Sequence, residues 1–174
     1  KISSEYFCIM GSDDFLGNNK YLESLIKSIQ NNDYDIVFPN FGVIEKGKKR
    51  IVNQTNNFNQ LDHKTVVPGI GWVGKKKILK NIRFNLKYKV ASDYDFLLKI
   101  YSKKFKFFRI FQTIYYFRVG TGTSYKLGRL GFEEQKTIAI KKKGPFFKII
   151  WTYLIANFRF FVRYKILNFF KTVS

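Results

Sequence analysis

The sequence predicts a mixed α/β fold with helices flanking a sheet and a basic helix at the C-terminal end. Within the first 45 residues, apolar strand-like runs alternate with an amphipathic helix, which is the strand–helix–strand order of α/β proteins. Of the 174 residues, 45% are hydrophobic and 19% are aromatic, enough to build a packed core. The last third is helical and basic, so we expect one main α/β unit followed by a different kind of segment.

The first predicted elements are a strand at 6–10, a helix at 18–32 and a strand at 34–44. The run YFCIM is short and nearly all apolar, which is typical of a strand buried on both faces. The helix has leucines and isoleucines at helical spacing, and Asn18 or Asn19 can cap it. Pro39 predicts that the second half of the next strand lies at a sheet edge or bends.

The second half of the chain contains further helices and one long strand. We expect a short helix at 75–82, a helix at 92–105 with Ser92 as its N-cap, and β structure at 106–119. A helix at 130–144 has a lysine-rich end and is closed by Gly144. A long helix follows from Pro145, a residue that suits the first turn.

The net charge of +20 is concentrated in the C-terminal half. Residues 1–70 hold eight basic and eight acidic side chains, whereas residues 97–174 hold seventeen basic and two acidic ones. This asymmetry indicates an anionic partner, such as a phosphate-rich ligand, a nucleic acid or an anionic membrane surface. The single cysteine, Cys8, excludes an intramolecular disulfide and is compatible with the cytoplasm.

Four of the twelve acidic residues form two tight clusters. Asp13 and Asp14 follow the first predicted strand, at the end where α/β sheets place their ligands. Carboxylate pairs bind hard divalent cations that share their coordination with substrate phosphates. The alternative is an ordinary Asx turn before the next helix.

Asp93 and Asp95 make the second cluster, in the first turn of the helix predicted at 92–105. Acidic side chains stabilise the start of any helix, and that is the simpler explanation. The functional alternative makes one of them a general base that deprotonates an acceptor hydroxyl. The two are two residues apart and point in different directions, so only one needs to face a site.

The order of these motifs resembles inverting GT-A glycosyltransferases of family 2. An apolar strand, GSDD, an amphipathic helix, DIVFPNF and SDYDFLLKI follow one another as in bacterial enzymes of polysaccharide and lipopolysaccharide assembly, including the colanic-acid type. The resemblance covers roughly residues 3–143 and implies a partial Rossmann-like GT-A fold. It also implies a nucleotide-sugar donor, a saccharide or lipid-linked acceptor, and Mg²⁺ or Mn²⁺.

The resemblance assigns roles to individual residues. Asp13, with Asp14 beside it, matches the metal-binding end of the family's D-x-D-D motif, although Gly11 replaces the first aspartate. Asp93 matches the catalytic base of the ED-x-D motif, with Ser92 in place of glutamate. The family's N-terminal strands, which bind the nucleotide base, have no counterpart, so the sequence resembles the C-terminal two-thirds of an enzyme.

Four further residues are candidates for substrate binding. In PGIGW, Gly71 permits close backbone approach and Trp72 can stack on a sugar face, or else the motif is a structural turn with a core tryptophan. Asp95 lies beside the predicted base, and Ser124 ends a small-residue loop that matches the family's tail.

The chain therefore divides into a glycosyltransferase-like unit at 1–143 and a basic amphipathic helix at 144–174. The longest uncharged run of this helix is about half the ~20 residues of a membrane span. It suits an anionic membrane surface, or else it packs on the catalytic unit. A non-catalytic fragment and a nucleic-acid-binding module are the alternatives, and the acidic clusters speak against the second.

Overall fold

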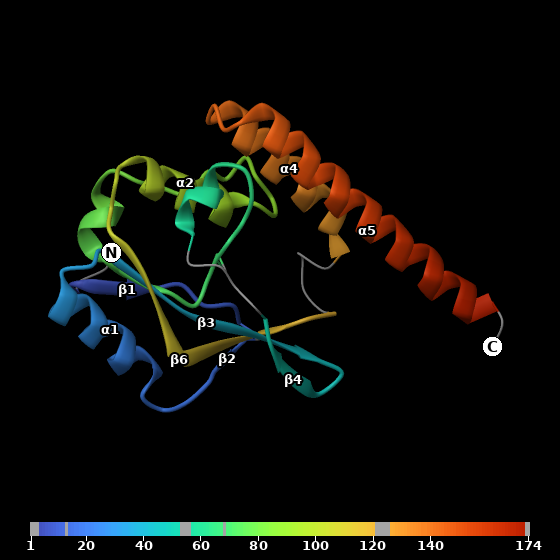
Figure 1. Cartoon of the computed structure of the whole chain (residues 1–174). Helices are drawn as coiled ribbons and strands as arrows, with labels where there is room; N and C mark the ends of the chain where they lie inside the picture. Colours follow the sequence, from blue (N-terminus) through green and yellow to red (C-terminus); the bar gives the residue numbers. More distant parts are fainter. Residues whose placement is uncertain (1–3, 13, 53–56, 68, 121–125, 173–174) are drawn as a thin grey trace.

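A six-stranded mixed sheet forms the centre of the computed structural model, which describes residues 4–12, 14–52, 57–67, 69–120 and 126–172 (Figure 1). The strand order is β1-β5-β3-β6-β2, and β4 pairs with β3. Only β3 and β6 run parallel among these pairs. The strands are β1 Tyr6–Cys8, β2 Phe15–Leu16, β3 Ile36–Glu45, β4 Lys48–Ile51, β5 Val73–Lys75 and β6 Phe107–Arg118. The predicted α/β class is confirmed.

Helices cover both faces of this sheet. Helix α1 (Tyr21–Asn32) packs on one face through Tyr21, Leu25 and Ile29. The other face carries the larger core, to which α2 (Ser92–Ser102), α4 (Gly128–Lys141) and the start of α5 (Phe146–Thr172) contribute. Two 3₁₀ helices, η1 (Phe58–Asp62) and η2 (Lys76–Lys80), add Leu61 and Ile78 to that core.

The structure corrects the expectation for Pro39. Strand β3 continues through this residue to Glu45 inside the sheet, with β6 on one side. On the other side, β5 pairs only with Ile36 and Val37, and β4 pairs only from Gly42 onward. The proline, which has no N–H to donate, therefore sits between two partner strands and at a register shift against β6, where residues 111–113 bulge out.

The predicted helix caps are wrong in two places. The N-cap of α1 is Lys20, and Asn18 instead accepts a hydrogen bond from the Lys20 N–H at 3.0 Å. Ser92 is the first residue of α2, and the cap position belongs to Ala91. The end of α4 follows the prediction only in part: Lys143, not Gly144, takes the left-handed φ of 57°, and the Gly144 N–H bonds back to the Ala139 carbonyl.

Candidate functional site

The first acidic cluster lies where the chain leaves β1, and a buried tyrosine organises it. The Tyr115 hydroxyl, from β6, donates to Asp14 Oδ2 at 2.6 Å and accepts from the Gly11 N–H at 3.1 Å. The Arg118 N–H donates to Asp14 Oδ1 at 3.3 Å. The Asp14 carboxylate is therefore fixed to β6 on both of its oxygens. Asp13 lies outside the described residues.

A bound metal ion would find one well-oriented carboxylate here. A carboxylate oxygen has two lone pairs, and the described hydrogen bonds use one on each oxygen of Asp14, so the group can still bind a hard cation. Mg²⁺ is commonly held by one or two carboxylates together with substrate phosphates, and Asp14 fits that arrangement. Among the described residues, no three carboxylate, histidine or cysteine side chains gather into a metal site.

The segment from Gly69 to Trp72 contacts both the residue that follows β1 and the first turn of α2. The Gly71 N–H donates to the Ile9 carbonyl at 2.6 Å, and the Tyr21 hydroxyl donates to the Gly71 carbonyl. Gly71 has a φ of +82°, and a Cβ there would fall on the Tyr115 ring. Glycine is needed at this position for both reasons.

Trp72 is part of the core. Its side chain is fully buried, its indole N–H donates to the Gly69 carbonyl at 2.9 Å, and its ring stacks 6.1 Å from that of Phe96. Phe7 packs edge-on against it. The structure therefore places Trp72 as the core tryptophan of a structural turn, with its ring faces covered by protein.

Asp93 meets this segment from the first turn of α2. Its Oδ1 accepts the Tyr94 N–H at 2.7 Å, and its Oδ2 lies so close to Gly69 that a Cβ on Gly69 would collide with it. Burial raises the pKa of the Asp93 carboxyl, and the backbone N–H groups lower it by less. A carboxylate whose pKa is raised is a stronger base, as general-base catalysis requires.

Asp95 points elsewhere. It is buried, and its Oδ2 forms an ion pair with Lys99 Nζ at 2.6 Å, one helical turn along α2. Lys99 also donates to the Arg83 carbonyl at 3.0 Å. Gly69 thus lies against Asp93 and Gly71 lies against the Tyr115 ring, whose hydroxyl binds Asp14, while Asp95 joins a separate ion pair. Ser124 lies outside the described residues.

Glu134 holds the start of α2 from a neighbouring helix. Its carboxylate accepts the N–H groups of Lys89, Val90 and Ala91, each at 2.9 Å. Burial raises the pKa of Glu134, but the three N–H donors outweigh it and leave the pKa lowered. Glu134 thus fixes the three residues that lead into α2, and the helix itself has no side-chain cap hydrogen bond from its cap residue Ala91.

Arg109 supports the segment that leads to Gly69. The guanidinium is buried, donates from Nη2 to the Val66 carbonyl at 3.0 Å, and lies 5.9 Å from the centre of the Phe58 ring. Burial lowers the pKa of Arg109 to about 10. Its Nε and Nη1 have no hydrogen-bond partner within the described part of the chain.

Sequence reasoning missed Gly69, Tyr115, Glu134 and Arg109 as parts of this site. Gly69 lies in the glycine-rich motif that was singled out, and Glu134 lies on a helix that the family resemblance includes. Nothing in the local sequence distinguishes Tyr115 from the aromatic residues around it.

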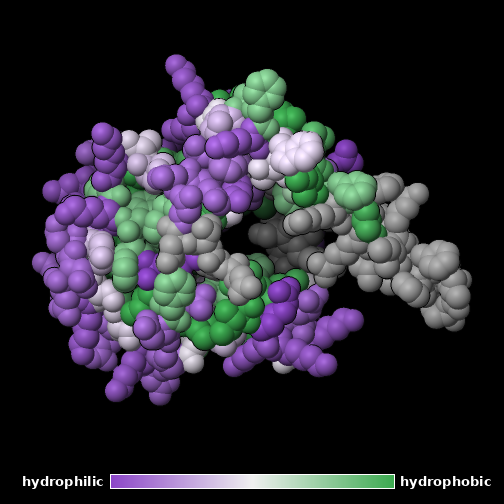
Figure 2. Space-filling view, viewed as in Figure 1, coloured by the Kyte–Doolittle hydropathy of each residue, from purple (hydrophilic) through white to green (hydrophobic). Residues whose placement is uncertain are grey.

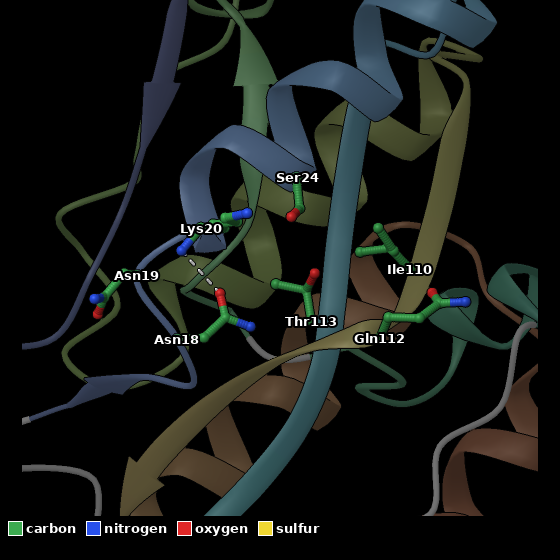
Figure 3. Close-up of a pocket in the computed structure, with 7 residues that line it drawn as sticks. All are labelled: Asn18, Asn19, Lys20, Ser24, Ile110, Gln112 and Thr113. Carbon is green, nitrogen blue, oxygen red and sulfur yellow. Dashed lines mark hydrogen bonds between the residues drawn. The ribbon is translucent and has the colours of Figure 1, made fainter.

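A pocket of about 680 Å³ lies beside this region, between the start of α1 and the bulge of β6 (Figure 3). Asn18, Lys20 and Ser24 line one side, and Gln112 and Thr113 line the other. Of the predicted site residues that the structure describes, none lines this pocket.

One solved structure relates the fold to a known class of protein. The chain is similar to the crystal structure of residues 1–349 of TarS from S. aureus, with a TM-score of 0.53 and 15% sequence identity. The match covers 86% of this chain and 47% of that one, so this chain spans about half the length of TarS 1–349. No protein-family model and no curated protein matches the sequence. The likeness shows a partial Rossmann-like, glycosyltransferase-like fold.

Proposed function

We propose that this protein is an inverting, metal-dependent glycosyltransferase of family 2 type. It moves a sugar from a nucleotide-sugar donor to a saccharide or lipid-linked acceptor in the synthesis of a cell-surface polysaccharide such as a lipopolysaccharide. The likeness of the fold to TarS supports a glycosyltransferase-like function at a coarse level. The observation that supports the proposal best is that one glycine segment lies against Asp93 at Gly69 and against Tyr115, which binds Asp14, at Gly71.

Asp93 is the catalytic base in this proposal. As the acceptor oxygen attacks the anomeric carbon, its proton passes to an Asp93 carboxylate oxygen and the bond from that carbon to the diphosphate breaks. Burial raises the pKa of Asp93 toward working pH, which makes this proton transfer more favourable. Gly69 leaves room for the carboxylate and fixes its position.

The metal ion in this proposal is Mg²⁺ or Mn²⁺, held by Asp13 and Asp14 together with the donor diphosphate. A bound ion would offset the charge that develops on the leaving nucleoside diphosphate. Tyr115 orients Asp14 for this role through its hydroxyl. Because nucleotide sugars are cytoplasmic metabolites, we place the reaction in the cytoplasm.

Titration calorimetry of the chain with UDP and other nucleoside diphosphates, with and without Mn²⁺, tests the metal site. We expect metal-dependent binding that Asp13→Ala and Asp14→Ala abolish. Glu23→Gln is the matched control, because it removes an exposed carboxylate from α1 that pairs with Lys27 one turn away. Metal-independent binding, or equal loss in the control, would contradict the assignment.

A further inference from the structure

Helix α5 presents a row of large apolar side chains to solvent. Phe147, Trp151, Leu154 and Phe158 are 87%, 68%, 58% and 68% exposed. Their spacing of four, three and four residues puts them on one face of the helix. Figure 2 shows green and white side chains along the outer side of α5, at the upper right of the molecule. We call these four residues, three of which are aromatic, the aromatic row.

The opposite face of α5 is already occupied. Ile149 and Tyr153 are buried in the main core, and α5 packs alongside α4 (Figure 1). Helix α5 therefore already has a buried face, and the aromatic row lies on the face that remains. The helix is fixed on the body of the protein with these side chains facing away from it.

Basic residues flank the aromatic row. Four exposed lysines lie between the end of α4 and the first turn of α5, and one of them, Lys148, lies about 100° around the helix from Phe147. After Glu134 the sequence contains nine lysines and arginines and no aspartate or glutamate. The exposed lysines are Lys141, Lys142, Lys143 and Lys148.

The arrangement of apolar and basic side chains on α5 favours one kind of binding partner over two others. A second copy packing through α5 would bring together two basic helices that have no carboxylates to pair with. A nucleic acid would call for cations among the stacking side chains, whereas the row itself contains none. An anionic bilayer accepts both features, because apolar side chains enter the headgroup boundary and lysines remain on the lipid phosphates.

We infer that α5 docks this protein onto an anionic lipid bilayer, with the aromatic row inserted and the four lysines on lipid phosphates. The helix lies in the plane of the surface, with the row extending about 16 Å along it at 1.5 Å per residue. No helix within the described residues is long and apolar enough to span a membrane. The inference does not depend on the proposed transferase activity.

Vesicle co-sedimentation tests the docking. We expect the chain to bind vesicles of phosphatidylcholine and phosphatidylglycerol, and to bind phosphatidylcholine alone more weakly. The triple variant Phe147→Ser, Trp151→Ser and Phe158→Ser should weaken binding by more than tenfold. Leu86→Ser is the matched control, because Leu86 is 91% exposed but lies outside α5.

A second pair of variants separates local from overall charge. Changing the four lysines to glutamine should weaken binding by about fivefold for each lysine that lies close to the surface. The control removes the same charge from the β3–β4 hairpin and should bind almost like the parent chain. Its substitutions are Lys46→Gln, Lys48→Gln, Lys49→Gln and Arg50→Gln.

Tryptophan fluorescence reports insertion directly. The chain has two tryptophans, the buried Trp72 and the exposed Trp151. Vesicles should shift the emission to shorter wavelength in the parent chain and not in Trp151→Phe. Equal losses in the variants and their controls would overturn the inference. So would a dimer that the triple variant dissociates, or preference for an oligonucleotide over vesicles.

Discussion

The start of α2 and the outer face of α5 place their side chains in opposite surroundings. At the start of α2, Asp93 lies against Gly69 without room for a methyl group, and Glu134 accepts three N–H groups. On α5 the aromatic row faces solvent. Substitutions in the first region should change geometry, activity and stability together, whereas those in the second should change only what the protein binds.

The largest effect should come from Asp93→Asn. Loss of a general base lowers turnover by roughly 10²- to 10⁴-fold, while the asparagine oxygen can still accept the Tyr94 N–H. Initial rates of sugar transfer at saturating donor measure this loss, and nucleotide affinity should be unchanged. Asp33→Asn, at an exposed aspartate, is the control. Near-normal turnover in Asp93→Asn would refute the assignment of the base.

Gly69→Ala tests whether the glycine segment positions that base. The added Cβ collides with the Asp93 carboxylate, so we expect turnover to fall roughly 10- to 100-fold. Overpacking should also cost about 1–3 kcal/mol in free energy of unfolding, measured by urea denaturation. Gly128→Ala is the control, because a Cβ there meets no atom within 4 Å. If Gly69→Ala and Gly128→Ala have the same turnover and the same unfolding free energy, Gly69 does not position Asp93.

Tyr115→Phe removes one hydroxyl that serves two partners. Asp14 Oδ2 loses its donor and the Gly11 N–H loses its acceptor, so we expect a loss of about 1–3 kcal/mol in unfolding free energy. Metal-dependent nucleotide binding should weaken as well. Tyr116→Phe, beside it on β6, is the control, because the described contact of Tyr116 is made by its ring with Lys49. An unchanged unfolding free energy would show that solvent replaces the hydroxyl.

Much of the fold was predictable because local patterns determine it. Short apolar runs and helical spacing gave β1, α1 and α2 close to their observed positions. The prediction for Pro39 was wrong because a proline fits inside a sheet where no neighbouring strand needs its N–H. Whether β4 and β5 leave such a gap is a property of the whole sheet. The start of α2 misled because Glu134, more than 40 residues away, holds Ala91 in the cap position by accepting its N–H.

The candidate site was only partly predictable for the same reason. The acidic pairs stand out in a basic sequence, and the family resemblance then selected Asp13 and Asp14 for the metal and Asp93 for the base. Their surroundings could not be predicted, because Gly69 and Tyr115 matter through contacts that only the folded chain creates. The aromatic row became visible only once Ile149 and Tyr153 showed which side of α5 is buried.

Glu134→Gln should have a smaller effect that depends on pH. The amide can replace only part of the carboxylate's hydrogen bonding, so we expect a loss of about 1 kcal/mol at neutral pH. The pKa of Glu134 is lowered by folding, so this stabilisation is complete above the ordinary glutamate pKa. It disappears as pH falls through the lowered pKa, and urea denaturation across acidic pH should show the two proteins converging.

Asp93→Asn should raise the unfolding free energy at neutral pH, whereas Glu134→Gln should lower it. Burial raises the pKa of Asp93, so its ionised form opposes folding at neutral pH, and the amide should make the protein more stable there. Below the ordinary aspartate pKa both states are protonated and the advantage should vanish. If the unfolding free energies of the two variants changed with pH in the same way, folding would not shift the pKa values of Asp93 and Glu134 in opposite directions.

The smallest effect on stability should come from substitutions in the aromatic row. It is the most direct test of the difference between α5 and the start of α2. Because Phe147, Trp151 and Phe158 face solvent, the triple serine variant should keep its unfolding free energy within about 0.5 kcal/mol per site. Turnover with a water-soluble acceptor should also be unchanged. Transfer to a lipid-linked acceptor in anionic vesicles should fall, because the variant no longer concentrates at the surface. A loss of stability comparable with that of Gly69→Ala would instead show that the row packs against the protein, and the two regions would then no longer differ in kind.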